Sequence, residues 1–331
     1  MLGFRATLLL HFFKMVTRDL VVSAYRLILG RDPETESVIE QAASAYGSEQ
    51  ELRAALLGSP EFASQIGHFI PRYPHDLGLE LPIEVECNAA DLQQLLTHTG
   101  RTWEKLGANE PYWSVLTSES FKSDQFHNNE EEFWGSGKHD VHRLITWMRR
   151  NGIAPSADWS CLEYGCGTGR MTYWLAEEFK AIFACDISGS HLRLARQRLS
   201  GVTSASVEFI EIFSLSALDQ LPVVDMVFSI IVLQHNPPPI IAYILDKLLK
   251  TLRPGGIAQF QIPTFWRGYT FELAQYLKHD SGEEMETHVL PQRYVFEIAR
   301  RNGCFPLEVQ PDGCVGSPEA ISTTFLLRKA G

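Results

Sequence analysis

The segment LEYGCGTGR, positions 162 to 170, carries a glycine at every second position and an acidic residue just before the first glycine. The glycines are Gly165, Gly167 and Gly169, and the acid is Glu163. Because glycine has no side chain, such a loop lets the backbone approach a ligand closely. A dinucleotide loop has the pattern G-x-G-x-x-G, and Arg170 stands where its third glycine belongs. The spacing therefore disfavours a nicotinamide dinucleotide and favours another adenosine-bearing cofactor.

This loop needs a scaffold, and the pattern after residue 158 predicts one. Short apolar runs alternate there with helical patterns, which is typical of a parallel sheet covered on both faces by helices. The last two strands have no helix between them, which predicts a hairpin at an antiparallel edge. The expected strands cover 161–165, 181–188, 207–212, 224–232, 257–262, 306–310 and 323–329, and the expected helices 169–179, 190–200, 239–251 and 291–302. We predict an α/β fold with a doubly wound, mostly parallel, seven-stranded sheet.

A second acidic residue stands where such folds bind ribose. Asp186 ends the second expected strand, 17 residues after Gly169. Related nucleotide folds place a ribose-binding acid roughly 20 residues beyond the glycine loop. The alternative for Glu163 and Asp186 is an ordinary polar contact at the end of a strand.

The arrangement LEYGCGTGR resembles motif I of class I S-adenosylmethionine-dependent methyltransferases, and three further segments match that family in order. They are CDIS at the end of the second strand, VDMVFSIIVLQH at 224–235 and LLKTLRPGG at 248–256. The resemblance covers about residues 130 to 329 and implies a Rossmann-like methyltransferase with S-adenosylmethionine as cofactor. The cofactor-binding residues that it implies are Glu163, Gly165, Cys166, Gly167, Gly169, Asp186, Ile187, Phe213, Ser214 and Gln234.

One position departs from the family pattern. Many relatives carry an acidic residue near the adenine after the third strand, whereas this chain has Phe213 followed by Ser214. Recognition of the adenine is therefore expected to use stacking and backbone groups. The resemblance also implies that Glu163 faces the cationic end of the cofactor and that Asp186 accepts hydrogen bonds from both ribose hydroxyls.

Two histidines are candidates for a catalytic base. Methyl transfer depends mainly on positioning of the acceptor, and a hydroxyl acceptor also benefits from a base, most often histidine. The resemblance places His235 near the reactive methyl group, beside Gln234. His288 lies between the fifth strand and the next helix, where the family often builds its acceptor site. The alternative for His235 is packing or capping before the segment NPPP.

Metal ligands are not predicted. The six cysteines are scattered and form no C-x-x-C pair, so neither zinc nor a redox dithiol is indicated. Glu283, Glu284 and Glu286 could hold a divalent cation together with His288. A solvated acidic loop is the favoured interpretation of that cluster.

A stretch before the glycine loop resembles a lid. EEFWGSGKHD, which ends at Asp140, resembles a segment that closes over the cofactor in this family, so Trp134 and Gly137 are candidates to line the pocket. The alternative is a tryptophan of the core and a glycine in a turn. A helix is expected over 138–152, with Gly152 just past its end.

The first part of the chain has a helical pattern of its own. Asp32 and Pro33 predict the cap and first residue of a helix over 34–46, and the spacing of SEQE predicts a capping box at Ser48. Residues 18 to 66 resemble the helical module of phycobilisome linkers and of bacterial enzymes of polysaccharide synthesis, which implies an interaction module. The alternative is an N-terminal helical cap without a partner. We expect this module at 1–67, a linker and helical segment at 68–130 and the methyltransferase domain at 131–331.

Composition limits the partners. The formal net charge of −11 argues against nonspecific binding to nucleic acid or anionic lipid. Residues 1 to 16 contain an apolar stretch that His11 and Lys14 interrupt, so the pattern fails for a secretory signal, and Met15 is an alternative start. We expect a cytoplasmic protein with reduced thiols and without a membrane span.

The resemblance implies transfer of a methyl group to an oxygen or nitrogen of an unidentified acceptor. A sugar or glycan intermediate is the first hypothesis, because of the enzymes that carry a similar helical module. A small metabolite or quinone is the second, and a noncatalytic cofactor-binding scaffold is a third. A nicotinamide-dependent dehydrogenase remains the least favoured alternative.

Overall fold

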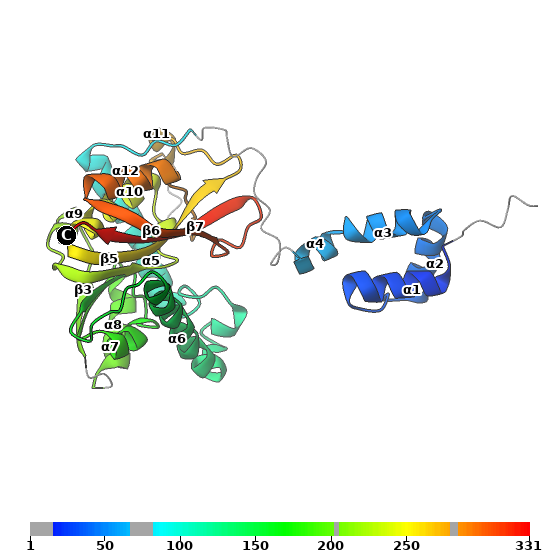
Figure 1. Ribbon diagram of the computed structural model, residues 1–331, viewed down its shortest axis with the longest axis horizontal. Coiled ribbons are helices and arrows are strands. Elements are labelled where there is room, and N and C mark those ends of the chain that lie inside the picture. Colours follow the sequence, from blue (N-terminus) through cyan, green and yellow to red (C-terminus); the bar gives the residue numbers. More distant parts are fainter. Residues whose placement is uncertain (1–15, 67–81, 202–204, 279–283) are drawn as a thin grey trace, which may run out of the picture. The chain divides into compact units, whose positions relative to one another are not determined.

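The computed structural model describes residues 16–66, 82–201, 205–278 and 284–331. Their contacts form two compact units, one from the described residues up to 66 and one from residue 82 onward. Both are drawn in Figure 1. Among the described residues, no helix has both the length and the apolar character needed to cross a bilayer.

The first unit is a small helical module. It consists of α1 (Arg18–Ala24), a continuing π turn η1 (Tyr25–Leu29), α2 (Glu36–Ala45), α3 (Glu49–Leu57) and α4 (Pro60–Ile66). Its apolar core includes Val21, Ile39 and Leu52. The capping box predicted at Ser48 is partly confirmed, because the Ser48 hydroxyl accepts from the backbone N–H of Glu51. The carboxylate of Glu51 reaches Gly47 rather than the capping residue.

The start of α2 differs from the prediction. Thr35, and not Asp32, is the N-cap, since its hydroxyl accepts from the backbone N–H of Val38. Asp32 instead pairs with the side chain of Arg26. The prediction at Asp32 and Pro33 was wrong because an acidic residue can find a cationic partner in the folded module instead of capping a helix.

The second unit confirms the predicted seven-stranded sheet, with strand order β3-β2-β1-β4-β5-β7-β6. The strands β1 to β5 run parallel, and β7 lies antiparallel between β5 and β6. The predicted hairpin is therefore formed by β6 and β7. The bounds are β1 (Ser160–Tyr164), β2 (Ala181–Asp186), β3 (Ser206–Glu211), β4 (Val224–Ser229), β5 (Leu252–Trp266), β6 (Cys304–Asp312) and β7 (Ala320–Lys329).

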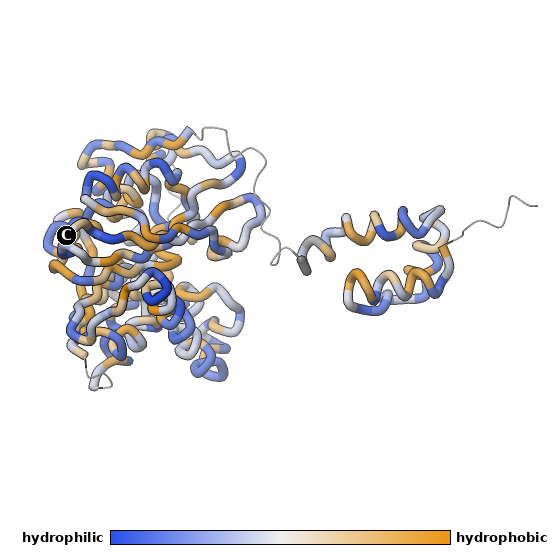
Figure 2. Tube along the Cα trace, viewed as in Figure 1, coloured by the Kyte–Doolittle hydropathy of each residue, from blue (hydrophilic) through white to orange (hydrophobic). Residues whose placement is uncertain are grey.

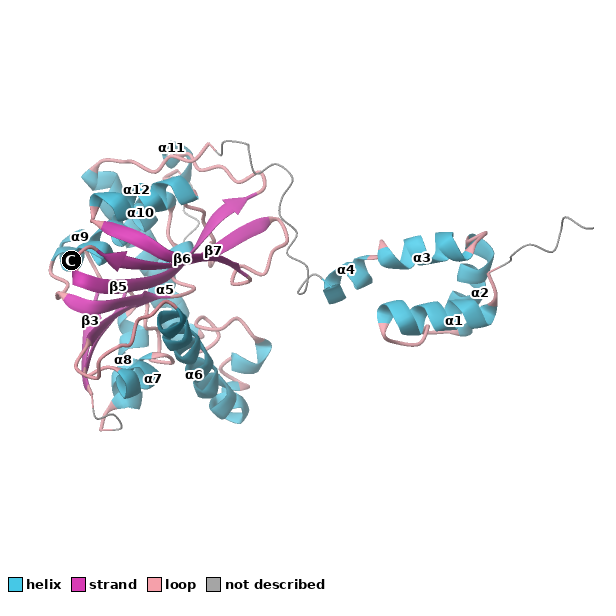
Figure 3. Ribbon diagram, in the orientation of Figure 1, coloured by secondary structure: helices cyan, strands magenta, loops and turns pink. Residues whose placement is uncertain are grey.

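Helices cover both faces of this sheet (Figure 3). Successive side chains of a strand point to opposite faces of the sheet, so alternate residues of one strand pack in two different cores. Leu162 packs in the core that contains α10 and α12, and its neighbour Cys161 packs in the core that contains α6 and α7. Apolar residues follow the strands in Figure 2. The helices are α5 (Ala89–Asn109), η2 (Glu119–Phe121), α6 (Phe126–Arg150), α7 (Thr172–Glu178), α8 (Gly189–Leu199), α9 (Leu215–Asp219), η3 (Leu233–His235), α10 (Pro238–Lys250), α11 (Leu273–Tyr276) and α12 (Gln292–Arg301).

The segment before the glycine loop belongs to this same unit. Leu92, Leu95 and Leu96 of α5 are buried in the sheet core, and α5 packs on α8 and α10. Most of the predicted linker, 68–81, lies outside the described residues. From residue 82 onward the chain packs against the sheet, so α5 can contribute to a site at the edge of the sheet.

The predicted lid is helical. The stretch that ends at Asp140 lies inside the 25-residue helix α6, which begins twelve residues before the expected start of a helix at 138. A side chain at Gly137 would overlap the backbone oxygen of Arg170, so this glycine allows α6 to approach the glycine loop. The alternative of a glycine in a turn was wrong, because tertiary packing requires the glycine inside a helix, where glycine is usually disfavoured. A role of this helix as a lid stays a prediction.

Candidate functional site

The glycine loop connects β1 to α7 and adopts a backbone that requires glycine. Gly165, Gly167 and Gly169 have φ values of +82°, +53° and +86°. A Cβ atom on Gly165 would overlap the side chain of Val232, and one on Gly167 would lie 2.7 Å from Val115. The structure therefore gives a reason for the glycines that differs from the expected one. They allow positive φ and close packing of neighbouring loops, which together bring the loop to the wall of a cavity.

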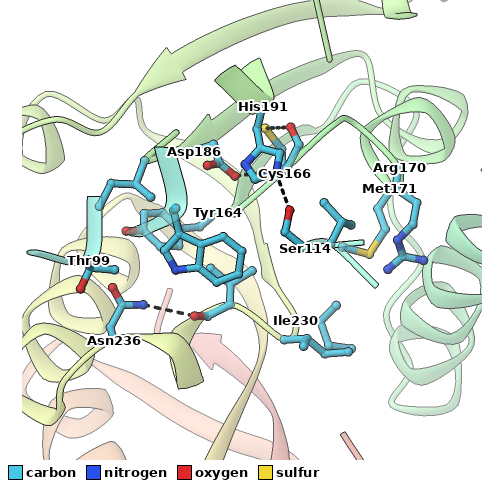
Figure 4. Close-up of a pocket in the computed structure, with 17 residues that line it drawn as sticks. Thr99, Ser114, Tyr164, Cys166, Arg170, Met171, Asp186, His191, Ile230 and Asn236 are labelled. Carbon is cyan, nitrogen blue, oxygen red and sulfur yellow. Dashed lines mark hydrogen bonds between the residues drawn. The ribbon is translucent and has the colours of Figure 1, made fainter. Parts of the chain in front are cut away.

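That cavity lies at the carboxyl ends of β1, β2 and β4, where ligands bind in open α/β sheets (Figure 4). It contains about 750 Å³ of space not filled by protein atoms, a volume that includes open solvent at its mouth. The lining residues are Thr99, Trp103, Ser114, Val115, Tyr164, Gly165, Cys166, Gly167, Arg170, Met171, Asp186, Ile187, His191, Ile230, Ile231, Val232 and Asn236.

Asp186 lies at the end of β2 and lines the cavity, as does Ile187. One carboxylate oxygen of Asp186 accepts from the backbone N–H of Gly167 at 2.8 Å, and the other accepts from that of Ser188 at 2.9 Å. The aspartate therefore ties the glycine loop to the start of α8. Each carboxylate oxygen has a second lone pair, which can accept a further hydrogen bond from a ligand hydroxyl.

Glu163 lies on β1 and is completely buried. It does not line the cavity, but the next two residues of the chain, Tyr164 and Gly165, do. One oxygen accepts from the hydroxyl of Thr172 at 2.6 Å. The other oxygen has no hydrogen-bond partner among the described residues. Burial raises the pKa of this carboxyl to about 7, although the bond from Thr172 and the charge of Arg170 act in the opposite direction. A buried acceptor without a partner is costly and indicates a ligand or solvent group.

Arg170 connects the loop to helix α6 at the cavity wall. Its guanidinium lies 2.7 Å from the carboxylate of Asp140 and donates to the hydroxyl of Ser136 at 3.0 Å. The Arg170 side chain is 4% exposed, and its Nε–H has no partner among the described residues. Thus the residue that breaks the dinucleotide pattern is a buried cation, and its ion pair holds α6 against the loop.

Gln234 and His235 lie in η3 and are buried, but neither lines the cavity. Nδ1 of His235 lies 2.7 Å from the backbone oxygen of Glu286, and Nε2 lies 3.2 Å from the side-chain nitrogen of Gln234. Burial lowers the pKa of His235 to about 4. Because both ring nitrogens are occupied, His235 could act as a base only after the Gln234 amide moves. Its catalytic role stays a prediction.

His288 is also engaged in hydrogen bonds away from the lining residues. Its Nδ1 lies 2.7 Å from the hydroxyl of Tyr269, and its Nε2 lies 2.9 Å from the carboxylate of Glu286. The hydroxyl of Tyr276 donates to the same carboxylate. Glu283 lies outside the described residues, and Glu284 is exposed. No group of three or more His, Cys, Asp or Glu residues that could hold a metal occurs in the described part of the chain.

The other predicted residues are divided. Cys166 lines the cavity, and burial raises the pKa of its thiol. Phe213 is 73% exposed and lies in a separate groove that shares Ile187 with the cavity. Ser214 caps α9. Trp134, the predicted lid residue, is likewise absent from the described lining.

Sequence reasoning missed the wall that α5 and the following turn provide. Trp103 lies with its ring centre 5.2 Å from that of His235, and Ser114 lies within 2.9 Å of Nε2 of His191, a bond drawn in Figure 4. Nε2 of His191 is also 3.2 Å from the backbone oxygen of Pro111, so the histidine anchors this turn to α8. The aromatic-rich stretch at 110–121 was the available signal, but it has no motif.

Part of the sheet unit is similar to known proteins. Residues 162–258 match a family model described as a methyltransferase domain. A curated relative, trans-aconitate 2-methyltransferase of Azoarcus sp. (strain BH72), is 35% identical over 104 residues, which are 31% of this chain and 38% of that protein. The matched part therefore spans well under half the length of that relative.

The fold of the sheet unit is similar to that of a solved methyltransferase. Magnesium protoporphyrin IX methyltransferase from Synechocystis PCC 6803, solved with bound SAH, is 15% identical with a TM-score of 0.50, over 71% of this chain and all of that one. An N-methyltransferase from Bradyrhizobium japonicum WM9 is 17% identical with a TM-score of 0.46, over the same shares. At this level of identity the likeness concerns the fold alone.

Proposed function

We propose that the cavity binds S-adenosylmethionine and that the protein transfers the methyl group of this cofactor to an acceptor. The observation that carries the proposal is the buried, unpartnered oxygen of Glu163 beside a glycine loop whose neighbouring strand ends in Asp186. A cofactor with an ammonium group and ribose hydroxyls supplies donors for both carboxylates. The methyltransferase domain match at 162–258 and the SAH bound in the Synechocystis relative support the same cofactor.

The proposed contacts follow from where the residues lie. Asp186, which lines the cavity, accepts from the ribose hydroxyls. The contact of Glu163 with the ammonium group of the amino-acid part is proposed from its buried, unpartnered oxygen, since Glu163 does not itself line the cavity. Gly165 to Gly167 and Ile187 contact the cofactor through backbone and apolar atoms, because they line the cavity. Contacts of Gly169, Phe213, Ser214 and Gln234 with the cofactor stay predictions, since none of them lines it. Phe213 would need to turn from solvent to stack on the adenine.

The reaction is an in-line displacement at the sulfonium methyl group. The bond from carbon to the acceptor oxygen or nitrogen forms as the bond from carbon to sulfur breaks, and S-adenosylhomocysteine leaves. The acceptor then loses a proton to a base or to solvent. The chain's own part is to hold the acceptor in line with the methyl group and to exclude water, which supplies much of the rate of such transfers. His235 and His288 remain candidate bases.

We propose an oxygen or nitrogen acceptor, with a sugar or glycan intermediate as the first hypothesis. Only the resemblance of residues 18–66 to modules of polysaccharide-synthesis enzymes supports the glycan hypothesis. The name of the Azoarcus relative favours the second hypothesis, a small metabolite, although that match covers 38% of the relative. The noncatalytic scaffold remains a third, because both candidate histidines are fully engaged and neither lines the cavity.

Calorimetric titration of the full chain tests the cofactor. We expect binding of S-adenosylmethionine and of S-adenosylhomocysteine, and no binding of NAD. Asp186→Asn should weaken binding by roughly tenfold or more, since a charge-assisted hydrogen bond contributes about 1.5–3 kcal/mol. Asp158→Asn is the matched control, because the Asp158 side chain is 84% exposed and only pairs with Lys180. Binding of NAD alone would refute the proposal.

Transfer of a labelled methyl group into fractionated lysate then identifies the acceptor class. Label in a polysaccharide fraction supports the first hypothesis, and label in a small-molecule fraction supports the second. Cofactor binding without label in any fraction favours the scaffold.

A further inference from the structure

The wall of the cavity contains a strained residue. Ile231, in the loop after β4, has φ of +57° and is the described non-glycine residue with positive φ. A branched side chain strongly disfavours this conformation, which persists only where surrounding contacts impose it. The neighbouring Val232 fills the space beside Gly165. The shape of the cavity next to the glycine loop therefore depends on what holds Ile231.

A glutamine buried in the sheet supplies that contact. Gln261 on β5 is fully buried, and its side-chain oxygen accepts from the backbone N–H of Ile231 at 3.0 Å. Its amide nitrogen donates to the side-chain oxygen of Gln234 at 3.0 Å and to the hydroxyl of Ser322 on β7 at 2.6 Å. Both amide hydrogens and the oxygen are used, so the side chain has one orientation that satisfies its partners.

The chain of hydrogen bonds continues in a single direction. Because the oxygen of Gln234 accepts from Gln261, its nitrogen donates to Nε2 of His235. Nδ1 of His235 then carries the proton and donates to the backbone oxygen of Glu286. A buried network whose members are all satisfied is rigid, and the loss of one member leaves its partners unpaired. The network connects the strained loop to β7 and to the segment before α12.

We propose that Gln261 is a positioning residue that holds Ile231 in its strained conformation and thereby shapes the cofactor side of the cavity. Gln261 does not line the cavity and acts only through Ile231. The inference rests on the proposed binding of S-adenosylmethionine. Glutamine fits this position because only a side chain with an acceptor and two donors can serve Ile231, Gln234 and Ser322 together.

Titration of S-adenosylhomocysteine into Gln261→Met tests the proposal, with Gln259→Met as the matched control. Gln259 is buried on the same face of β5, two residues before Gln261. It lies opposite Phe228 of β4 in the sheet and not opposite the loop that contains Ile231. We expect Gln261→Met to raise the dissociation constant about tenfold and Gln259→Met to change it less than twofold. Thermal unfolding of both variants records any common loss of stability.

Repeating the substitution in the Ile231→Gly variant separates the positioning of Ile231 by Gln261 from a general effect on the stability of the fold. Glycine adopts positive φ without strain, so in Ile231→Gly the same Gln261→Met substitution should weaken binding much less than in the wild type. If Gln261→Met does not fold, Ser322→Ala replaces it, and we expect a two- to threefold loss of affinity. This loss should again be smaller in the Ile231→Gly background.

Equal affinities of Gln261→Met and Gln259→Met, with unfolding temperatures lowered alike, would overturn the proposal and leave cofactor binding intact. An undiminished loss in the Ile231→Gly background would also overturn it. Failure of the wild type to bind S-adenosylhomocysteine would remove the proposed function and this inference together.

Discussion

Replacement of Glu163 by glutamine gives the sharpest test of the buried acid. Burial raises the pKa of this carboxyl from 4.5 to about 7 in the folded chain without cofactor. A raised pKa means that the folded state binds a proton more tightly than the unfolded state. The free protein is therefore stabilised by the protonated acid at low pH, and this contribution is lost as the pH rises through 4.5 to 7. Glutamine has nearly the same shape and does not titrate.

The size of the effect follows from the shift. A shift of about 2.5 pKa units corresponds to roughly 3 kcal/mol, because one unit corresponds to about 1.4 kcal/mol. Most of this difference develops between pH 5 and pH 8. We therefore expect the free energy of unfolding of Glu163→Gln, relative to the wild type, to increase by about 2 to 3 kcal/mol over that range. The bond from Thr172 favours the ionised acid, and its effect is already contained in the pKa of about 7.

Urea unfolding of both proteins at pH 5, 6, 7 and 8 measures this difference. Titration with S-adenosylhomocysteine measures the other consequence, since an ammonium group beside Glu163 favours the ionised acid. Wild-type affinity should rise between pH 5.5 and pH 7 with release of a proton, and Glu163→Gln should bind weakly with no such rise. A stability difference that stays constant between pH 5 and pH 8 would refute the reasoning about Glu163.

Three further outcomes follow from the structure. Gly165→Ala should lower the free energy of unfolding in urea by about 2–5 kcal/mol, because positive φ and overlap with Val232 both oppose a side chain. The control Gly152→Ala, with φ of +72° and open space around it, should lower it by only about 1–2 kcal/mol. A pKa of about 4 predicts that NMR signals of the His235 ring stay constant from pH 5.5 to 8; an inflection near 6.5 would contradict this. Ser114→Ala removes a hydrogen bond to the buried His191 of α8 and should lower the free energy of unfolding in urea by about 1 kcal/mol. An unchanged free energy would show that other contacts hold the turn that contains Ser114.

The fold could be predicted from local patterns because strands and helices of a wound sheet have different periods. Each of the seven expected strands corresponds to a strand of the sheet. They could be recognised because each is a short apolar run bounded by polar residues. Helix α6 was predicted only from residue 138 because Gly135 and Gly137 disfavour a helix. The contact between Gly137 and the backbone of Arg170 explains the glycine and is visible only in three dimensions.

The site divides in the same way. Gly165, Cys166, Gly167, Asp186 and Ile187, which the sequence predicts to bind the cofactor, all line the cavity. They meet there because β1 and β2 are parallel neighbours and end at the same edge of the sheet. The wall contributed by α5 could not be predicted. Its residues have no motif of their own, and the sheet edge brings them together with the glycine loop from far away in the sequence.

This division bears on the acceptor. The methyltransferase match at 162–258 includes the glycine loop, Asp186 and the loop after β4, but it excludes Trp103 and Ser114, which also line the cavity. A cofactor common to many methyltransferases places similar demands on the matched part, whereas acceptors differ. We therefore expect the α5 wall to determine which acceptor fits. Because Trp103 also packs against His235, a change there would alter the acceptor side and the hydrogen-bonded network behind it together.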